Sequence, residues 1–338
     1  MILKNSLKQA RIMIAKTTHV GDVVITLPLA GVLKRYYPDC QVLFLAKGPG
    51  CDIAKRCPFI DEVYDESILD TENGLQNCQV DIFIQANNSK RLALAAKKAK
   101  IPMRIGSFYR YYNWLLCNYG VMISRGRSGL NKRQLDLQYL KPLAIKQKFT
   151  YQDMTSLYVF SQKSLDDRLS HIISPHKFKL ILHPSLITAK KYQWPLDYFK
   201  QLILSLDLEH FQIFITGIDS DRIYLSDFLV EMKAHVIDLV GQINMDEFVT
   251  FIQHCDGMVA GSTGPLHLAA ALGIHALGIY RADKTYIKRW EAVGWKAEAF
   301  AQESPCLKCP SGDPCQCILS VKPEYVKRRV LAWSGADS

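Results

Sequence analysis

The chain has 338 residues, 49% of them hydrophobic, and a formal net charge of +10. This length and composition predict a water-soluble protein of two domains with sizeable cores, and no apolar run approaches the roughly 18 residues that a membrane helix needs. The first 16 residues lack the continuous apolar stretch of a secretory signal, so we expect a cytoplasmic protein whose ten cysteines are reduced.

Short apolar segments alternate with helical segments through the first half of the chain. This alternation is typical of parallel sheets with right-handed crossovers. Strands are predicted at 11–15, 41–45, 62–64 and 80–84, and helices at 23–37, 51–57 and 89–100.

The loop after the first strand, Lys16–Asp22, lacks the G-x-G-x-x-G pattern that an NAD(P)-dependent oxidoreductase would have there. Instead, Asp22 stands where the next helix begins. Aspartate is a common helix N-cap, and this is one interpretation of Asp22. A carboxylate at this place also has the chemistry of a general base that takes a proton from an acceptor hydroxyl. The local sequence leaves both interpretations open.

The positive charge is concentrated in one stretch. Between Asp81 and Asp136 there is no acidic residue, and aromatic residues such as Tyr111 and Trp114 are interleaved with the basic ones. The basic residues of this stretch are Lys90, Arg91, Lys97, Lys98, Lys100, Arg104, Arg110, Arg125, Arg127, Lys132 and Arg133. This imbalance predicts an anionic partner: membrane headgroups, a phosphorylated acceptor or nucleic acid. Of these three we do not expect nucleic acid, because no recognisable reader module accompanies the stretch.

The second half of the chain repeats the alternation after a polar stretch at 161–176, which we interpret as a linker. Strands are predicted at 179–183, 211–216, 235–239, 258–260 and 276–280, and helices at 196–207, 220–232, 245–254, 265–272 and 323–333. We therefore expect an N-terminal domain at 1–165, a C-terminal domain at 177–320, and a final helical segment at 321–338. One hypothesis for this final segment is that it packs back on the N-terminal domain.

The strand–turn–helix segment at 256–273 carries the strongest local indication of a ligand. A tight turn at Gly261–Gly264 leads into a helix whose first position suits Pro265. Backbone amides around this turn, including those of Thr263 and Leu266, would converge where the helix dipole is positive. A phosphate is the usual occupant of such a site, although many strand–glycine–helix turns hold no ligand.

Three sets of residues, in order along both halves of the chain, resemble glycosyltransferase family 9, the lipopolysaccharide heptosyltransferases. The first set is Gly21–Pro28 with Leu33–Pro38, the second is His183–Ser185 with Trp194–Phe199, and the third and closest is Ser262–Gly273. Together they span roughly Arg11 to Tyr280.

This resemblance implies an α/β protein of GT-B fold, with two Rossmann-like parallel-sheet domains facing each other across a cleft. It implies an inverting, metal-independent transfer without a cofactor, from a nucleotide diphosphate sugar such as ADP-heptose to a lipopolysaccharide core acceptor. The aspartate matching Asp22 is the base, and the matching donor loop holds the diphosphate through backbone amides. The donor residues implied are Ser262, Thr263, Gly264, Pro265, Leu266 and His267. A base on the hydroxyl and amides on the leaving diphosphate suit this chemistry.

Two positions depart from the family pattern. The family usually has an aspartate where this chain has Ser262, and a lysine where it has Tyr192. Lys190 and Lys191 are displaced toward the N-terminus. As flexible point charges they are candidates for the donor phosphate, with solvated loop residues as the alternative.

Acidic and cysteine clusters elsewhere do not lead us to expect a metal. Asp219-Ser220-Asp221 has the form of a D-x-D motif, but we prefer the start of a surface helix. By the resemblance, Asp219 and Asp221 are instead candidates for the ribose contact. The thiols of four nearby cysteines could coordinate a zinc ion, but we prefer the interpretation that they are simple reduced thiols. The four are Cys306, Cys309, Cys315 and Cys317.

The acceptor side belongs to the N-terminal half in this architecture. Its candidates are His19, Gly21, Lys90, Arg91 and Arg110. The basic stretch with its aromatics also fits peripheral contact with an anionic membrane, at the inner face of the inner membrane. The rival functions are a non-catalytic nucleotide-sugar-binding or regulatory protein on the same fold and a transferase with a different nucleotide sugar. The sequence leaves the oligomeric state open.

Overall fold

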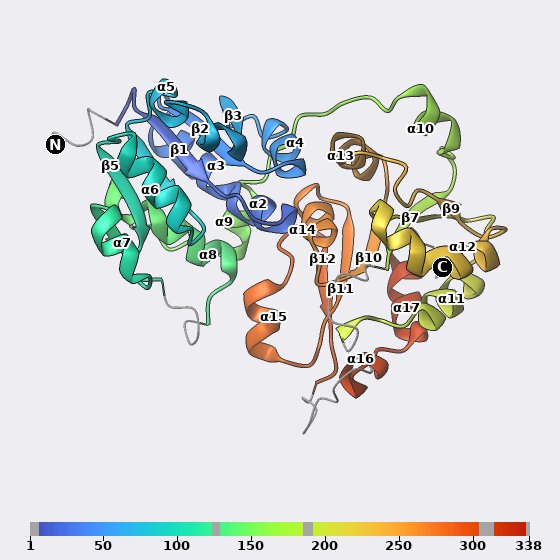
Figure 1. The fold of residues 1–338 in the computed structure, drawn as a ribbon. Coiled ribbons are helices and arrows are strands. Elements are labelled where there is room, and N and C mark those ends of the chain that lie inside the picture. The colour runs from blue at the N-terminus through green and yellow to red at the C-terminus, as the bar shows by residue number, and fades with distance from the viewer. Residues whose placement is uncertain (1–6, 124–128, 185–191, 304–313, 336–338) are drawn as a thin grey trace. The chain divides into compact units, whose positions relative to one another are not determined.

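The computed structural model describes residues 7–123, 129–184, 192–303 and 314–335. Its internal contacts divide the chain into an N-terminal unit, Met1–Ser161, and a C-terminal unit, Gln162–Ser338. Figure 1 shows both units, and each is described here by itself.

Six parallel strands form the sheet of the N-terminal unit, in the order β3-β2-β1-β4-β5-β6. Their bounds are β1 Arg11–Ala15, β2 Gln41–Ala46, β3 Glu62–Asp65, β4 Ile82–Gln85, β5 Met103–Ser107 and β6 Tyr119–Val121. Ile12, Met13 and Ile14 of the central strand β1 are fully buried. A near-continuous apolar run is expected of a parallel strand that is covered on both faces.

Short helices cover this sheet. Their bounds are α2 Val20–Thr26, α3 Pro28–Tyr36, α4 Pro49–Lys55, η1 Glu66–Asp70, α5 Gly74–Asn77, α6 Lys90–Lys98, α7 Tyr111–Leu116, α8 Lys132–Leu137, η2 Gln138–Leu143 and α9 Tyr151–Thr155. The single helix predicted at 23–37 is two helices. Pro28 has no N–H to continue the first one, and the N–H of Leu27 donates to both Val23 and Val24.

The sheet of the C-terminal unit is also six-stranded and parallel, in the order β12-β11-β10-β7-β8-β9. Its strands are β7 Phe178–His183, β8 Phe211–Ile215, β9 Ile237–Asp238, β10 Gly257–Gly261, β11 His275–Ile279 and β12 Ala297–Phe300. Counted within each unit, the two strand orders are the same. Each unit places its first strand beside its fourth, and the strand order reverses between them.

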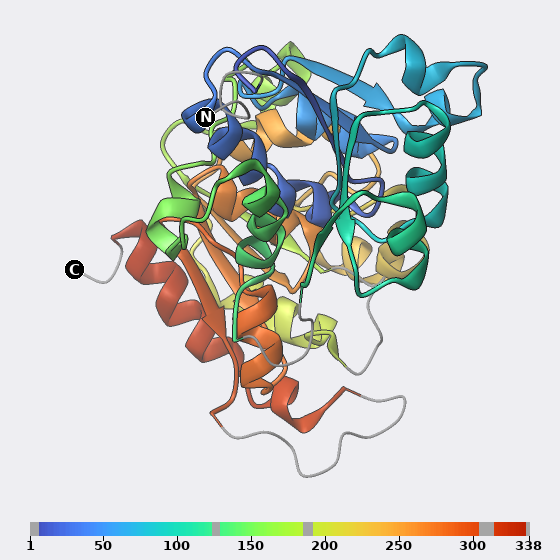
Figure 2. The ribbon, with the colours of Figure 1, turned by 90° about the vertical axis from the view of Figure 1, so that its left-hand side faces the viewer.

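The helices of the C-terminal unit complete its core. They are α10 Asp167–Ile172, α11 Leu196–Ser205, η4 Asp219–Asp221, α12 Arg222–Met232, α13 Met245–Gln253, α14 Gly264–Ala271, α15 Lys284–Trp290, α16 Gln316–Leu319 and α17 Pro323–Ser334. The last helix, α17, packs against α11, and its Trp333 stacks on His275 at 4.9 Å between ring centroids. Figure 2 shows α17 in red beside the orange strands of this sheet.

An aspartate fixes the start of the first strand in each sheet. Asp81, just before β4, accepts the backbone N–H of Arg11 at 2.8 Å. Asp256, just before β10, accepts the backbone N–H of Lys179 at 2.7 Å. In both units, therefore, a hydrogen bond from a backbone N–H to an aspartate carboxylate joins the first strand to the start of the fourth.

Several regions differ from the sequence expectation. The expected linker at 161–176 contains α10. Elements also occur where none was predicted: η1 and α5 follow β3, the segment at 101–160 contributes β5, β6 and several short helices, and α15, β12 and α16 follow β11. None of the helices in the described part of the chain combines the length and hydrophobicity needed to cross a membrane.

Candidate functional site

The carboxyl ends of β1 and β4 form the switch point of the N-terminal sheet, because Ala15 pairs with Gln85 there and the strand order reverses. Ligands of open α/β sheets bind in the crevice outside such a point. The loops that follow the two strands are held together, since Lys16 Nζ donates to the Ala86 carbonyl at 3.2 Å.

Asp22 stands above this switch point, in the first turn of α2. The N-cap of the helix is His19, so the interpretation of Asp22 as the cap is wrong. The His19 side chain makes no capping hydrogen bond and is exposed, whereas Gly21 is buried in the first turn. Asp22 is 22% exposed and thus accessible to a substrate.

Two lysines and two aspartates form a charge cluster around this carboxylate, consisting of Lys16, Asp22, Lys132 and Asp136. Lys16 Nζ lies 3.5 Å from Asp22 Oδ1 and 3.9 Å from Asp136 Oδ2. Asp136 also pairs with Lys132 and accepts a hydrogen bond from Thr26 Oγ1 at 3.3 Å. Lys16 and Asp136 are almost completely buried, so Asp22 is the more exposed carboxylate of the cluster.

The helix α8 brings Lys132 and Asp136 to the cluster, because it packs on α2. Its start is fixed by Asn131 and Gln134, whose side chains and backbones bond reciprocally as a capping box. Burial lowers the pKa of Lys132 from its ordinary value, and the attraction of Asp136 opposes that shift. Lys16 and Asp136 are not among the site residues predicted from the sequence, although a lysine directly after a buried strand is a visible signal.

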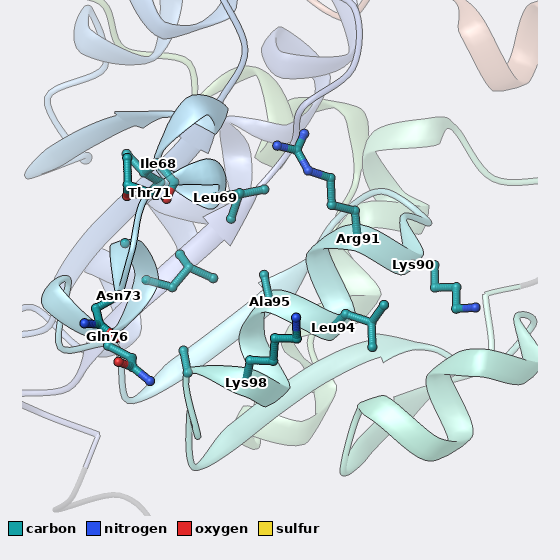
Figure 3. A pocket seen from close by; sticks show the side chains of 13 residues that line it. Ile68, Leu69, Thr71, Asn73, Gln76, Lys90, Arg91, Leu94, Ala95 and Lys98 are labelled. Atoms are coloured by element: carbon teal, nitrogen blue, oxygen red, sulfur yellow. Dashed lines mark hydrogen bonds between the residues drawn. The ribbon is translucent and has the colours of Figure 1, made fainter.

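The other acceptor candidates lie on α6 and at the start of α7. Lys90 and Arg91 open α6 and line a cavity of about 640 Å³ between that helix and the η1–α5 segment, which Figure 3 shows. Arg91 Nη2 pairs with Asp70 Oδ1 at 2.6 Å. Arg110 is exposed at the N-cap of α7. No member of the charge cluster lines this cavity, so the structure does not gather the five acceptor candidates into one place within the unit.

In the C-terminal unit the donor loop follows β10. Thr263 is the N-cap of α14 with φ −128° and ψ 168°, and its side chain makes no capping hydrogen bond. The helix begins at Gly264 with Pro265 in its first turn. The first amides of a helix have no partner within it, and they lie at the positive end of its dipole. This arrangement suits an anion.

Two of the six donor-loop residues direct their side chains into the protein. Leu266 and His267 are buried, at 0% and 4% exposure. A Cβ on Gly278 would come within 2.6 Å of Leu266 Cδ2, which shows how closely the helix approaches β11. Any contact of these two residues with a ligand is therefore through the backbone.

The end of β7 also carries a polar residue at the switch point of this sheet, where His183 pairs with Ala260 of β10. His183 Nδ1 lies 2.9 Å from Thr216 Oγ1. Burial lowers the pKa of His183 to about 4, so the imidazole is neutral at physiological pH.

The two candidates for the ribose contact have different environments. Asp221 is 3% exposed, and its Oδ2 accepts the N–H of Ile218 at 3.0 Å. Burial raises the pKa of Asp221. Asp219 is exposed and lies against Gly241, whose φ of +66° favours glycine. Asp221 thus closes the turn after β8, and Asp219 is the one available to a ligand.

Several candidates lie outside the described residues, namely Lys190, Lys191, Cys306 and Cys309. The other two cysteines, Cys315 and Cys317, belong to the apolar core of the C-terminal unit, and their sulfurs are 3.3 Å apart. Within the described ranges no group of three or more histidine, cysteine or acidic residues could hold a metal ion.

Two Rossmann-like units with the same strand order, each with polar residues gathered at its switch point, place this chain in the GT-B class. Solved structures of that class cover nearly all of it. The ADP-heptose lipopolysaccharide heptosyltransferase II of Escherichia coli superposes with a TM-score of 0.79 and 19% identity, over 97% of this chain and 99% of that one. An E. coli heptosyltransferase with ADP superposes with a TM-score of 0.72 and 16% identity, over 96% of this chain and 99% of that one.

The family model for glycosyltransferase family 9 (heptosyltransferase) matches residues 68–318. Lipopolysaccharide heptosyltransferase 3 of E. coli is 21% identical over 80% of this chain and 82% of its own length. Lipooligosaccharide heptosyltransferase 2 of Haemophilus ducreyi is 24% identical over 78% and 80%. The chain belongs to glycosyltransferase family 9 and is a glycosyltransferase.

Proposed function

We propose that this protein transfers a heptose-like sugar with inversion, without a metal, from a nucleotide diphosphate sugar to a lipopolysaccharide core acceptor. The observation that carries the proposal is Asp22, an accessible carboxylate held beside the buried ammonium of Lys16 at the switch point of its sheet. ADP-heptose is the first candidate for the donor, because similar proteins of the family are heptosyltransferases and one solved relative is described with ADP.

In the proposed reaction Asp22 takes the proton of the acceptor hydroxyl, while the hydroxyl oxygen attacks the anomeric carbon of the donor sugar. The bond from that carbon to the diphosphate oxygen breaks, and the nucleoside diphosphate leaves with the electron pair. Attack opposite to the leaving group inverts the anomeric centre. Lys16 compensates the negative charge of Asp22 before the proton arrives, and Asp136 compensates Lys16 afterwards.

The donor diphosphate belongs at the N-terminus of α14 in this proposal. The amides of Thr263, Gly264 and Leu266 would neutralise the charge that develops on the leaving group, together with the hydroxyls of Ser262 and Thr263. Pro265 has no N–H and serves to start the helix. The remaining assignments, also proposals, are Lys190 and Lys191 near the phosphates, Asp219 at the ribose, and His19 and Gly21 at the acceptor.

Binding of nucleoside diphosphates by the purified protein tests the identity of the donor. We expect ADP to bind at least about tenfold more tightly than UDP, GDP or CDP, a free-energy difference of about 1.4 kcal/mol. Isothermal titration calorimetry measures all four at one salt concentration. A preference for another base would contradict ADP-heptose while leaving the type of reaction in place, and no binding of any diphosphate would contradict the donor site.

A lipopolysaccharide acceptor carries a lipid, so we further propose peripheral contact with the anionic inner face of the inner membrane, from the cytoplasm. The surface of α7 supports this part of the proposal. Tyr111, Trp114 and Leu115 are exposed at 81%, 65% and 75%, and Arg110 precedes them. The side chain of Lys97 reaches α7 from the neighbouring helix α6, donating to the Leu115 carbonyl at 3.0 Å. Aromatic residues with cations around them suit the interface of an anionic bilayer.

Removing the apolar residues of this surface should weaken binding to vesicles. For Trp114→Ala/Leu115→Ala we expect about tenfold weaker co-sedimentation with phosphatidylglycerol–phosphatidylcholine vesicles, because two interfacial side chains are lost. The matched control is Trp295→Ala in the C-terminal unit, where the tryptophan is equally exposed at 64%. Equal vesicle binding by both variants, or vesicle binding that does not depend on the content of anionic lipid, would contradict a membrane surface at α7.

A further inference from the structure

Arg281 follows β11 at the carboxyl edge of the C-terminal sheet, where Ile279 pairs with Gly261 of β10. Its guanidinium lies against two tyrosine rings. The Cζ atom is 4.2 Å from the ring centroid of Tyr286 and 5.0 Å from that of Tyr192. Contact with aromatic faces restricts the orientation of a planar guanidinium. Arg281 is therefore an oriented cation on the edge that carries the donor loop.

Tyr286 joins this cation to the donor loop. Its hydroxyl donates to Ser262 Oγ at 3.4 Å, and Ser262 directly follows β10. Asp283 fixes both partners, since its Oδ1 accepts the backbone N–H of Tyr286 at 2.9 Å and its Oδ2 lies 3.0 Å from Arg281 Nη2. The guanidinium and the loop are thus parts of one connected arrangement.

One donor of Arg281 has no acceptor among the described residues. Its Nε is buried, and nothing in the described ranges accepts a hydrogen bond from it. Thr263 Oγ1, at the N-cap of α14, is also buried and has no hydrogen-bond partner among the described residues. A buried donor without an acceptor is destabilising, and more so if it is charged. The acceptors that pair most strongly with a guanidinium are carboxylate and phosphate oxygens.

The geometry points to Arg281 as the arginine that binds the diphosphate of the donor nucleotide, together with the amides of α14. This inference rests on the proposed function, because it takes a nucleotide diphosphate sugar as the donor. It also gives a physical role to the two residues that depart from the family pattern. Tyr192, where a lysine is usual, supplies an aromatic face to the guanidinium. Ser262, where an aspartate is usual, accepts from Tyr286 and adds no negative charge beside the phosphates.

The test compares a nucleoside diphosphate with its nucleoside. The probe is whichever of ADP, UDP, GDP or CDP the unaltered protein binds, and its partner is the corresponding nucleoside: adenosine, uridine, guanosine or cytidine. We expect Arg281→Met to weaken diphosphate binding by about 10- to 100-fold and to leave nucleoside binding unchanged, because only the charged hydrogen bonds are lost. Arg281→Lys should lie between the two, since lysine keeps the charge but not the planar donor geometry.

The matched control is Arg328→Met on α17, an exposed arginine whose Cζ is 5.1 Å from the ring centroid of Tyr325. It should bind the diphosphate as the unaltered protein does. Unchanged diphosphate binding by Arg281→Met overturns the inference and leaves the proposed function standing. If no diphosphate binds to the unaltered protein, the proposed function fails and the inference with it. Should Arg281→Met not fold, as shown by its thermal transition, unaltered affinity of Arg281→Lys overturns the inference.

Discussion

Replacing Asp22 by asparagine should reduce kcat by about 1,000-fold, within the range that general-base catalysis contributes. Asparagine has nearly the same shape, but its amide oxygen cannot take a proton from the acceptor hydroxyl. The donor is expected to bind with its original affinity, because the proposed diphosphate site belongs to the donor loop after β10. Single-turnover transfer and calorimetric titration with the preferred nucleoside diphosphate measure the two quantities separately.

A matched control for this variant is Asp167→Asn, an exposed aspartate in the first turn of α10. It should keep both activity and donor affinity. If Asp22→Asn lost turnover and donor affinity in equal proportion, the residue would be part of the donor site or of the fold, and the base would have to be sought elsewhere. A variant with nearly full turnover would also exclude it.

Replacing Lys16 by methionine should lower the free energy of unfolding by about 3 kcal/mol, because Asp22 loses the ammonium beside it and the buried Asp136 keeps Lys132 but loses one of its two cationic partners. Lys16 is 3% exposed, and its ammonium is shared between Asp22 and the buried Asp136. Methionine preserves the length and the apolar stem of the side chain, so the charge is the main change. Chemical denaturation monitored by tryptophan fluorescence measures the effect.

The control is Lys34→Met, which removes a similar pair of contacts nearer the surface. Lys34 Nζ is 2.7 Å from Asp61 Oδ2 and donates to the Cys40 carbonyl at 2.8 Å. Its side chain and that of Asp61 are 20% and 37% exposed, so we expect a loss below about 1 kcal/mol. Equal losses of unfolding free energy in the two variants would show that the charge cluster stabilises the fold no more than a surface ion pair does. Asp136→Asn should cost less in the Lys16→Met background than alone, as expected for coupled sites.

Much of the fold was predictable because its central strands are buried on both faces. Runs such as Ile12–Ala15 and Leu180–Leu182 are apolar and buried over their whole length. The edge strand β6 and the helix α7, two of the elements that were not predicted, differ in this respect. Tyr119 and Gly120 of β6 are exposed, and α7 directs several of its large apolar side chains to solvent. A hydrophobic pattern in the sequence indicates a helix or strand that buries its apolar residues. It does not indicate a helix or strand whose apolar residues face solvent.

The candidate site could be predicted from the sequence where it is local. Asp22 and the loop at Ser262 each belong to a segment in which a strand is followed directly by a helix, so short motifs were enough to single them out as candidates. Asp136 joins the cluster from 110 residues beyond Thr26, through the packing of α8 on α2. Arg281 is likewise placed by its neighbours, for no local motif marks it. Such contacts require the positions of helices relative to a sheet, which a single sequence does not contain.

The common strand order of the two sheets has a consequence for synthesis on the ribosome. In each half the first strand to emerge becomes the central one, and the aspartate that fixes its start arrives much later, 70 residues on in one case and 77 in the other. Until then a largely apolar strand in the nascent chain has one edge without a neighbour. Unpaired strand edges bind chaperones or other chains. Each half therefore passes through its own period of aggregation risk, which ends only when its fourth strand has been made.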